Sequence, residues 1–349
     1  MTVEELLHKG RADFIFPGAV VGICTPDKVE ILPVGAHTYD AHSTRVRDDT
    51  RYDVASITKA IPTAYLIWKC IELGKLSLEQ PVQELLPEWH GKYKDQVLLW
   101  QLLAQAVKYE PVSLASLSFL GAEALQLRIL EMKLVEPPGK SYYYVNTNSI
   151  LLGWILEKVS GKTLQDLAQE YFWQPLGMNS IGFFPPASEL GNIAPTELQA
   201  DGTLLHGKVH DESARVLSAA GRAVGSAGLF SNVPDLLRFL QMLLRQGENV
   251  LQPATVAAAW QTRALESGEQ VSLGWEFNNT AWMGKLGSDC FGKTGFTGGF
   301  CAIFPQEQRG VVMLSNAVHP KRPHERETLT QLRKEVLAAS LHLNLSPKY

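Results

Sequence analysis

The 349-residue sequence is poor in cysteine and has no long apolar run. Its four cysteines show no metal-type spacing, and each lies in an apolar stretch: Cys24, Cys70, Cys290 and Cys301. They are most simply buried free thiols, although a cross-strand pair of Cys290 with Cys301 stays open. No apolar run approaches the ~20 residues that a membrane-spanning helix needs. The sequence thus indicates neither a cysteine-based metal site nor a membrane partner.

An excess of charge of either sign is also absent. The chain has 32 Lys and Arg against 36 Asp and Glu, so a nucleic-acid partner is not expected. Hydrophobic residues make up 45% and charged residues 19%, which is ordinary for a globular protein. The start shows no basic segment followed by an apolar stretch and a cleavage site, and residues 2–5 instead form a capping-box pattern. With the free cysteines, this predicts a cytoplasmic protein. The oligomeric state is open, with a monomer favoured.

Three short motifs stand far apart along the chain. They are Ser56-Ile57-Thr58-Lys59, then Tyr144-Val145-Asn146, then Lys293-Thr294-Gly295. A lone S-x-x-K is weak evidence, because about one chance occurrence is expected in a chain of this length. Together, the three motifs supply a nucleophile, two candidate proton carriers and a backbone donor. These are the parts that acyl transfer through a serine requires.

The chemistry of these residue types suggests how they would work. A serine hydroxyl needs a base, and Lys59 lies on the same face of a helix as Ser56. Lys59 can accept a proton only if burial or a second cation, such as Lys293, lowers its pKa. Tyr144 between the two lysines would have a lowered pKa and act as base and then acid. We expect a helix to begin near Ser56, so that its N–H can bind an oxyanion, and Asn146 to hold Lys59 or a substrate carbonyl.

The motifs and their surroundings resemble a family of serine hydrolases. This family includes class C β-lactamases, D-alanyl-D-alanine carboxypeptidases and lactamase-like esterases. The resemblance extends from about residue 14 to 316, and the matching segments are Phe14–Gly22, Tyr52–Lys59, Pro138–Gly139, Tyr144–Asn148, Leu151–Gly161, Pro175–Met178, Gly225–Ser231 and Gly292–Gly299. It implies the α+β penicillin-recognising fold, an antiparallel sheet flanked by helices with a mostly helical insertion.

The resemblance also implies roles for individual residues. Ser56 would be the nucleophile, with Lys59 and Tyr144 as the proton-transfer pair. The backbone N–H groups of Ser56 and Phe296 would form the oxyanion hole. Substrate binding and electrostatic support would come from Asn146, Lys293, Thr294 and Gly295. No metal or other cofactor is implied.

The sequence departs from relatives at three places near this site. Where many relatives have Leu-Leu-x-His-Thr-Ser-Gly, this chain has Leu102-Leu103-Ala104-Gln105-Ala106-Val107-Lys108. Phe296 stands where lactamases commonly have a small residue, so a phenyl ring would narrow the cleft. Relatives with the Gly-Phe-Thr-Gly continuation often have His in place of Lys293. This mixture of lactamase-like and esterase-like features leaves the substrate class open.

The pattern of the chain predicts how these segments meet. Two strands are expected in 18–36, and further strands at 271–276, 299–304 and 310–315. The clearer helices are expected at 61–74, 99–107, 122–132, 148–159, 163–172, 233–245 and 325–342. We therefore predict a sheet domain from residues 1–60 and 218–349 and a helical domain from 61–217. The active site is expected at their seam, where pockets are common.

A second constellation allows another interpretation. His206, His210 and Asp211 could form a metal set, because two histidines lie four residues apart beside a carboxylate. Gly202 and Gly207 disfavour a helix there, however, so a hydrogen-bonded loop over the cleft is the preferred interpretation. We expect the loop 201–215 to shape substrate choice.

The function predicted from the sequence is that of a serine hydrolase working through an acyl-enzyme on Ser56. Its substrate would be a small ester or a D-amino-acid peptide or amide. β-Lactamase activity is the alternative within the same class. A lactamase-like module that binds or regulates without turnover is the alternative of another class, and the intact set of site residues disfavours it.

Overall fold

A six-stranded antiparallel sheet is built from both ends of the chain. The computed structural model describes residues 1–219, 221–324, 326–343 and 345. The strand order is β2-β1-β10-β9-β8-β7. The strands are β1 (Gly18–Cys24), β2 (Val29–Gly35), β7 (Glu276–Phe277), β8 (Phe291–Thr294), β9 (Gly298–Phe304) and β10 (Arg309–Asn316). Two small antiparallel pairs lie outside it, β3 (Tyr52–Asp53) with β4 (Phe230–Ser231) and β5 (Thr262–Ala264) with β6 (Gln270–Ser272).

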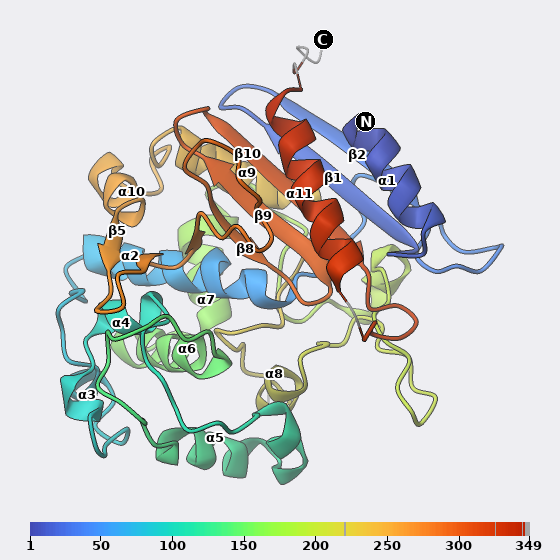
Figure 1. Ribbon diagram of the computed structural model, residues 1–349. Helices are drawn as coiled ribbons and strands as arrows, with labels where there is room; N and C mark the ends of the chain where they lie inside the picture. Colours follow the sequence, from blue (N-terminus) through green and yellow to red (C-terminus); the bar gives the residue numbers. More distant parts are fainter. Residues whose placement is uncertain (220, 325, 344, 346–349) are drawn as a thin grey trace.

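Both faces of the sheet are covered, and this explains why every residue of β1 is buried. Helices α1 (Val3–Ala12) and α11 (Glu327–Leu341) lie side by side over one face (Figure 1). Helix α9 (Val233–Leu244) packs on β1 and β10 from the other face. Alternate residues of a strand point to opposite faces, so the sheet separates two apolar cores.

The four cysteines are free thiols. Cys301 belongs to the core on the α9 side of the sheet, whereas Cys290 belongs to the core under α1 and α11. Burial raises the pKa of Cys24 to about 12. Of the two arrangements that the sequence left open, the cross-strand disulfide is absent and the buried thiols are present.

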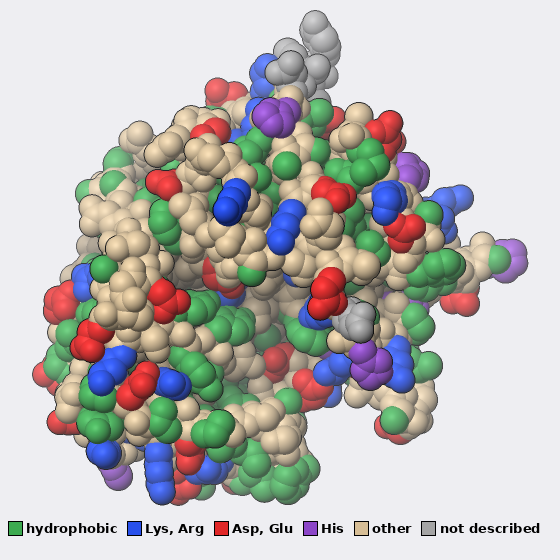
Figure 2. Space-filling view, in the orientation of Figure 1, with side chains coloured by type: hydrophobic (Ala, Val, Ile, Leu, Met, Phe, Trp, Pro, Cys, Tyr) green, Lys and Arg blue, Asp and Glu red, His purple; other side chains and the backbone are tan. Residues whose placement is uncertain are grey.

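A region of short helices lies on one side of the sheet, below it in Figure 1. Its packed interior is continuous with the core on the α9 side. Figure 2 shows a hollow across the middle of this face, between the sheet region and the helical region. Among the described residues, no helix is both long and apolar enough to cross a membrane. The remaining helices are α2 (Tyr65–Glu72), α3 (Val82–Leu85), α4 (Leu99–Leu103), α5 (Ala122–Glu131), α6 (Asn146–Ser160), α7 (Leu164–Ala168), α8 (Glu212–Leu217) and α10 (Pro253–Ala259).

The predicted strand pair in 18–36 is confirmed, but several predicted helices are shorter than expected. Helix α2 begins at Tyr65, and the predicted start at residue 61 lies in a π-helix over Ala60–Ala64 that is interrupted at Ile61, whose φ and ψ are −115° and 109°. Pro62 follows it, and proline disfavours the helical conformation in the residue before it. The helix predicted over 99–107 ends at Leu103, whereas that predicted over 163–172 is present as α7 followed directly by a π-helix over Gln169–Trp173. Residue 325 of the predicted last helix lies outside the described residues.

Helix α6 and the segment before β4 come unusually close at Gly153 and Gly225. A Cβ on Gly225 would lie 2.2 Å from the carbonyl oxygen of Ser149 and 3.2 Å from Cα of Gly153. The next residue, Ser226, accepts a 2.8 Å hydrogen bond from Lys59 Nζ at its carbonyl. The glycine therefore allows the backbone to reach the lysine.

We predict that Gly225→Ala destabilises the protein by about 1–3 kcal/mol, because backbone atoms have no room to move away from the added methyl group. Thermal unfolding measures this as a lowered Tm. Gly191→Ala is the matched control, since a Cβ there meets nothing within 4 Å. Equal melting temperatures for the two variants would contradict the prediction.

Candidate active site

Ser56 lies in a tight turn held by its neighbours. The 3₁₀ turn Ala55–Lys59 follows β3, and Ala55 has φ of 47°, a left-handed conformation that non-glycine residues rarely adopt. The carboxylate of Asp53 stabilises this turn by accepting a 2.8 Å hydrogen bond from the Ala55 N–H. Its other oxygen accepts from the His210 N–H at 2.7 Å. Burial raises the pKa of Asp53 to about 6. One buried acid thus connects the Ser56 turn with the loop 201–215.

Lys59 reaches the hydroxyl of Ser56 from the same turn. Its Nζ lies 2.9 Å from Ser56 Oγ and 2.8 Å from the carbonyl oxygen of Ser226. The residue is only 4% exposed. Burial, helped by the charge of Lys293, lowers the pKa of Lys59 although Tyr144 and Asp211 oppose the shift. A lysine whose charged form is disfavoured can accept a proton.

Tyr144 lies between the two lysines. The centroid of its ring is 5.2 Å from Lys59 Nζ and 4.0 Å from Lys293 Nζ. Burial opposes ionisation of the phenol, but the charges of Lys293 and Lys59 and the contact with Ser56 lower its pKa. Tyr144 is nevertheless 42% exposed, so a substrate can reach it. The structure therefore brings together Ser56, Lys59, Tyr144 and Lys293, which come from three remote segments.

Lys293 has a partner that sequence reasoning missed. Its Nζ lies 2.6 Å from Oε1 of Glu276, and both side chains are nearly buried. Burial disfavours the Lys293 charge, but Tyr144 and Glu276 outweigh this and raise the pKa of Lys293. Trp282 Nε1 and Asn279 Nδ2 donate to the other oxygen of Glu276, at 2.6 and 2.7 Å. Glu276 lies in the strand paired with β8, but no local motif identifies its contact with Lys293.

The turn after Lys293 packs on the backbone that leads to Ser56. A Cβ on Gly295 would lie 2.5 Å from the Val54 carbonyl oxygen, so only glycine allows this contact. Arg333 of α11 donates to the carbonyl oxygens of Gly295 and Gly299, at 2.9 and 3.1 Å. Among the described residues, the backbone N–H groups of Ser56 and Phe296 have no protein acceptor. Both are therefore free to bind an oxyanion.

Asn146 begins α6, two residues after Tyr144. Its Nδ2 donates to Oδ2 of Asp211 at 3.0 Å. The amide is thus held by Asp211, whereas the sequence had suggested Lys59 or a substrate carbonyl as its partner. The N–H of Ala214 and the hydroxyl of Ser213 donate to the other oxygen of Asp211, at 2.8 and 2.7 Å. Burial opposes this charge, but these bonds and Lys59 lower the pKa of Asp211. Beside Asp53 and Glu276, the site thus contains a third carboxylate, the half-buried Asp211.

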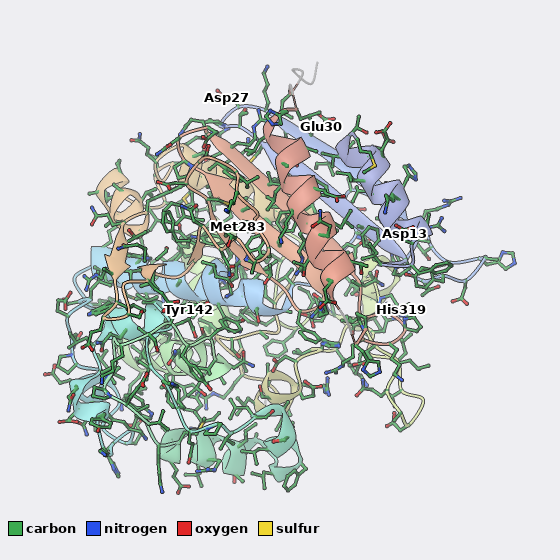
Figure 3. The ribbon with its side chains drawn as sticks, viewed as in Figure 1. Asp13, Asp27, Glu30, Tyr142, Met283 and His319 are labelled. Atoms are coloured by element: carbon green, nitrogen blue, oxygen red, sulfur yellow. The ribbon has the colours of Figure 1, made fainter. Side chains whose placement is uncertain are left out.

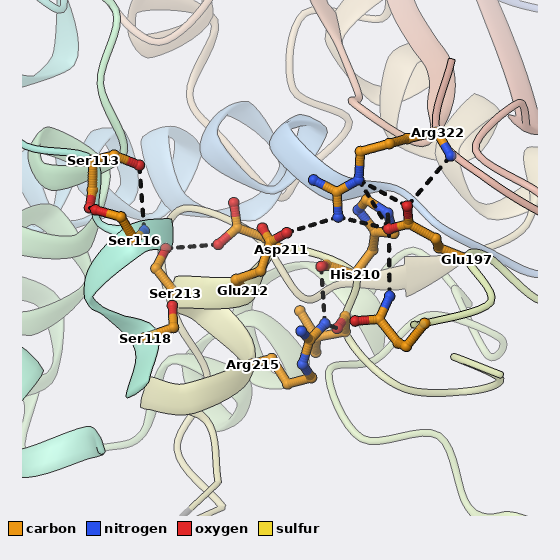
Figure 4. A network of polar contacts seen from close by, with 12 residues as sticks. Ser113, Ser116, Ser118, Glu197, His210, Asp211, Glu212, Ser213, Arg215 and Arg322 are labelled. Carbon is orange, nitrogen blue, oxygen red and sulfur yellow. Dashed lines mark hydrogen bonds and ion pairs between the residues drawn. The ribbon is translucent and has the colours of Figure 1, made fainter. Parts of the chain in front are cut away.

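The two histidines of the suspected metal set have separate partners. His206 Nε2 lies 2.9 and 2.8 Å from the carbonyl oxygens of Leu190 and Ile193. His210 Nε2 lies 3.2 Å from Glu197, whose carboxylate also binds Arg322 (Figure 4). Within the described part of the chain, no three acidic, histidine or cysteine side chains form a metal-binding group.

Phe296 forms a wall beside this network. Its ring stacks on that of His210 with centroids 5.6 Å apart, and the guanidinium of Arg326 lies 4.1 Å from its centroid. Phe296 is 44% exposed. Burial, together with the charge of Arg322, lowers the pKa of His210 and favours the neutral ring. The loop 201–215 therefore contacts the Phe296 ring through His210.

Gln105, from the stretch that differs from relatives, fixes the Tyr144 segment. Its backbone carbonyl accepts from the Tyr143 N–H at 2.7 Å, and its side-chain Oε1 accepts from the Val145 N–H at 3.1 Å. The same oxygen accepts from Asn148 Nδ2 at 3.2 Å. Gln105 is buried and has φ of 55°. It therefore holds the backbone on both sides of Tyr144.

An antiparallel sheet flanked by helices, with Ser-x-x-Lys, tyrosine and Lys-Thr-Gly segments meeting beside it, defines the penicillin-recognising fold. A family model described as Beta-lactamase matches residues 3–334, and the chain belongs to this family, whose members are serine hydrolases. The resemblance predicted from the motifs is therefore confirmed.

Individual relatives agree with this assignment. A Salmonella typhi protein described as "Putative D-alanyl-D-alanine carboxypeptidase" is 28% identical over 318 residues, which span 80% of this chain and 72% of that protein. The structure resembles a class C β-lactamase from Rhodobacter sphaeroides with a TM-score of 0.73 and 21% identity, covering 96% of this chain and 97% of that one. A β-lactamase/D-alanine carboxypeptidase from Pseudomonas syringae gives a TM-score of 0.77 at 19% identity, with the same coverage.

We predict that Gln105→Ala slows labelling of Ser56 by a fluorophosphonate probe about 10-fold or more, because Tyr144 loses its fixed position. The labelling rate is followed by intact-protein mass spectrometry, with thermal unfolding confirming that the variant is folded. Gln96→Ala, at an exposed glutamine of the same region, is the control. An unchanged labelling rate in a folded Gln105→Ala variant would contradict the positioning role.

Proposed function

We propose that this protein is a serine hydrolase that forms an acyl-enzyme on Ser56 and hydrolyses a small ester or a D-amino-acid peptide or amide. The observation that carries the proposal is the 2.9 Å contact between Lys59 Nζ and Ser56 Oγ in a buried site. Membership of a serine hydrolase family supports the class of reaction. The names of the D-alanyl-D-alanine carboxypeptidase relatives support peptides as one substrate class.

Acylation would use the proton-transfer pair twice. Lys59 and Tyr144 take the proton of Ser56 Oγ as this oxygen forms a bond with the substrate carbonyl carbon. The N–H groups of Ser56 and Phe296 would stabilise the oxyanion that develops. The pair then gives the proton to the leaving oxygen or nitrogen as its bond to the carbonyl carbon breaks. Ser56 is left as an ester.

Hydrolysis of this ester repeats the sequence with water. The pair takes a proton from water while the water oxygen bonds to the acyl carbon. The bond from that carbon to Ser56 Oγ breaks, and Oγ receives the proton. The acid product leaves, and the resting enzyme returns.

Two alternative functions are retained from the same observations. β-Lactamase activity is supported by the structural likeness to class C enzymes, and a shared site would give slow lactam turnover or a long-lived adduct. A binding or regulatory module without turnover is disfavoured, because such a module has no need for a lysine of lowered pKa beside a serine.

We predict that intact-protein mass spectrometry detects an acyl adduct with at least one member of a panel of p-nitrophenyl esters, nitrocefin and D-Ala-D-Ala peptides. Ser56→Ala should abolish the adduct and lower kcat/KM by roughly 10³-fold or more, because the other groups cannot replace the nucleophile. Ser77→Ala, at an exposed serine, is the control. Absence of any adduct and turnover in the wild type would favour the binding module.

We predict that Lys293→Gln moves the acid limb of the pH–rate profile for acylation to higher pH. Lys293 lowers the pKa values of Lys59 and Tyr144. These groups act deprotonated, so the rate falls as the pH drops through their pKa values, which rise when the cation is removed. Lys285→Gln makes the same charge change at an exposed position. Superimposable profiles for Lys293→Gln and the wild type would contradict this assignment.

A further inference from the structure

The positive charge of Lys293 is compensated by a carboxylate within the protein. Glu276 contacts Lys293 Nζ at 2.6 Å, and the two side chains are only 11% and 4% exposed. Trp282 and Asn279 fix the other oxygen of Glu276, so this carboxylate has little freedom to turn away. Breaking such a buried pair is costly, because it leaves an uncompensated charge. The pair therefore persists when a substrate binds.

Lys59 has an acidic neighbour as well. Asp211 lies near enough to raise the pKa of Lys59, and it is held by Asn146, Ser213 and Ala214. The ring of Tyr144, with its centroid 4.0 Å from Lys293 Nζ, covers a further side of that lysine. Lys293 is thus paired with a carboxylate, and Asp211 adds a second negative charge near Lys59. A substrate carboxylate would have to compete with Glu276 and would meet like charge.

A cavity of about 380 Å³ adjoins the Lys293–Glu276 pair, and the charged side chains that line it are acidic. Among the described residues, its lining includes Glu276, Glu269 and aromatic side chains such as Trp275, but no Lys, Arg or His. Tyr142, which also lines it, lies where the sheet region meets the helical region (Figure 3). Tyr142, Trp275 and Glu276 also border the small space next to Lys59 and Lys293. A substrate group entering this cavity would therefore meet acidic and aromatic groups.

Of the two arginines that contact the Phe296 ring, Arg322 is paired with carboxylates, whereas Arg326 contacts the ring and a backbone carbonyl. Arg322 binds the carboxylates of Glu197 and Glu212. Arg326 lies on the Phe296 ring and donates to the carbonyl oxygen of the same residue. Arg326 is the strongest competing site for a substrate carboxylate, so it enters the test below.

We propose that this site disfavours substrates that carry a carboxylate close to the scissile bond. Neutral esters and amides would react in preference to peptides with a free carboxyl end and to β-lactams that bear a carboxylate. The inference rests on the proposed hydrolase function and narrows its substrate class. Its structural basis is the Lys293–Glu276 pair, supported by Asp211 and by the acidic cavity.

The test uses two thioesters that differ only in the charge of the leaving group. The acyl group that gives the largest Ser56 adduct in the panel above is joined to thioglycolate in one substrate and to thioglycolamide in the other. Values of kcat/KM are divided by the uncatalysed hydrolysis rates, which removes the difference in intrinsic reactivity. The wild type should prefer the neutral thioester about 10-fold or more.

Variants then assign the preference to the ion pair. Glu276→Gln should reduce the preference several-fold, because Lys293 becomes available to the carboxylate. Glu266→Gln removes a charge from an exposed position nearby and should leave the preference unchanged. Arg326→Ala should also leave it unchanged.

Equal or faster reaction of the charged thioester in the wild type would overturn the proposal, whatever the stability of the variants. Loss of that reaction in Arg326→Ala would then place the carboxylate at Arg326. A folded Glu276→Gln variant that keeps the full preference would also overturn it. Failure of the hydrolase function itself is distinguishable, because no panel compound would then form an adduct on Ser56.

Discussion

The site depends on keeping two lysines close together in a buried space. In the proposed mechanism Lys59 takes a proton from Ser56, and burial together with the charge of Lys293 lowers the pKa of Lys59, which favours this role. A second buried cation is itself unfavourable, and Glu276 stabilises it. Both lysines lower the pKa of Tyr144, because their positive charges favour its phenolate form. The surrounding fold holds these four side chains at fixed separations.

The sequence predicted which side chains converge at the candidate site better than it predicted the contacts that hold them. Ser56, Lys59, Tyr144 and Lys293 belong to short motifs of fixed spacing, so they could be named as candidates without coordinates. Their convergence follows from a sheet built from both chain ends. Three supporting contacts could not be predicted, those of Glu276 with Lys293, Asp211 with Asn146, and Gln105 with the backbone around Tyr144. Each joins residues far apart in the chain and has no local pattern.

The departures from relatives now have structural explanations. Gln105 lies in the altered stretch and anchors the tyrosine segment through both its backbone and its side chain. The Phe296 ring packs between His210 of the 201–215 loop and Arg326, which lies just before α11. Lys293 stands where relatives with the Gly-Phe-Thr-Gly continuation often have His. Its charge lowers the pKa values of Lys59 and Tyr144, and Glu276 compensates that charge. The combination describes a family member that keeps the candidate proton-transfer groups while the residues around them differ from those of relatives.

The central claim is that Lys59 is the lysine of lowered pKa beside the nucleophile. NMR titration of protein labelled with ¹³Cε-lysine tests this most directly, with the Lys59 and Lys293 signals assigned from Lys59→Arg and Lys293→Arg variants. We predict that Lys59 titrates below the usual lysine pKa of about 10.4 and that Lys293 titrates above it. A Lys59 signal that titrates together with the exposed lysines would contradict the account.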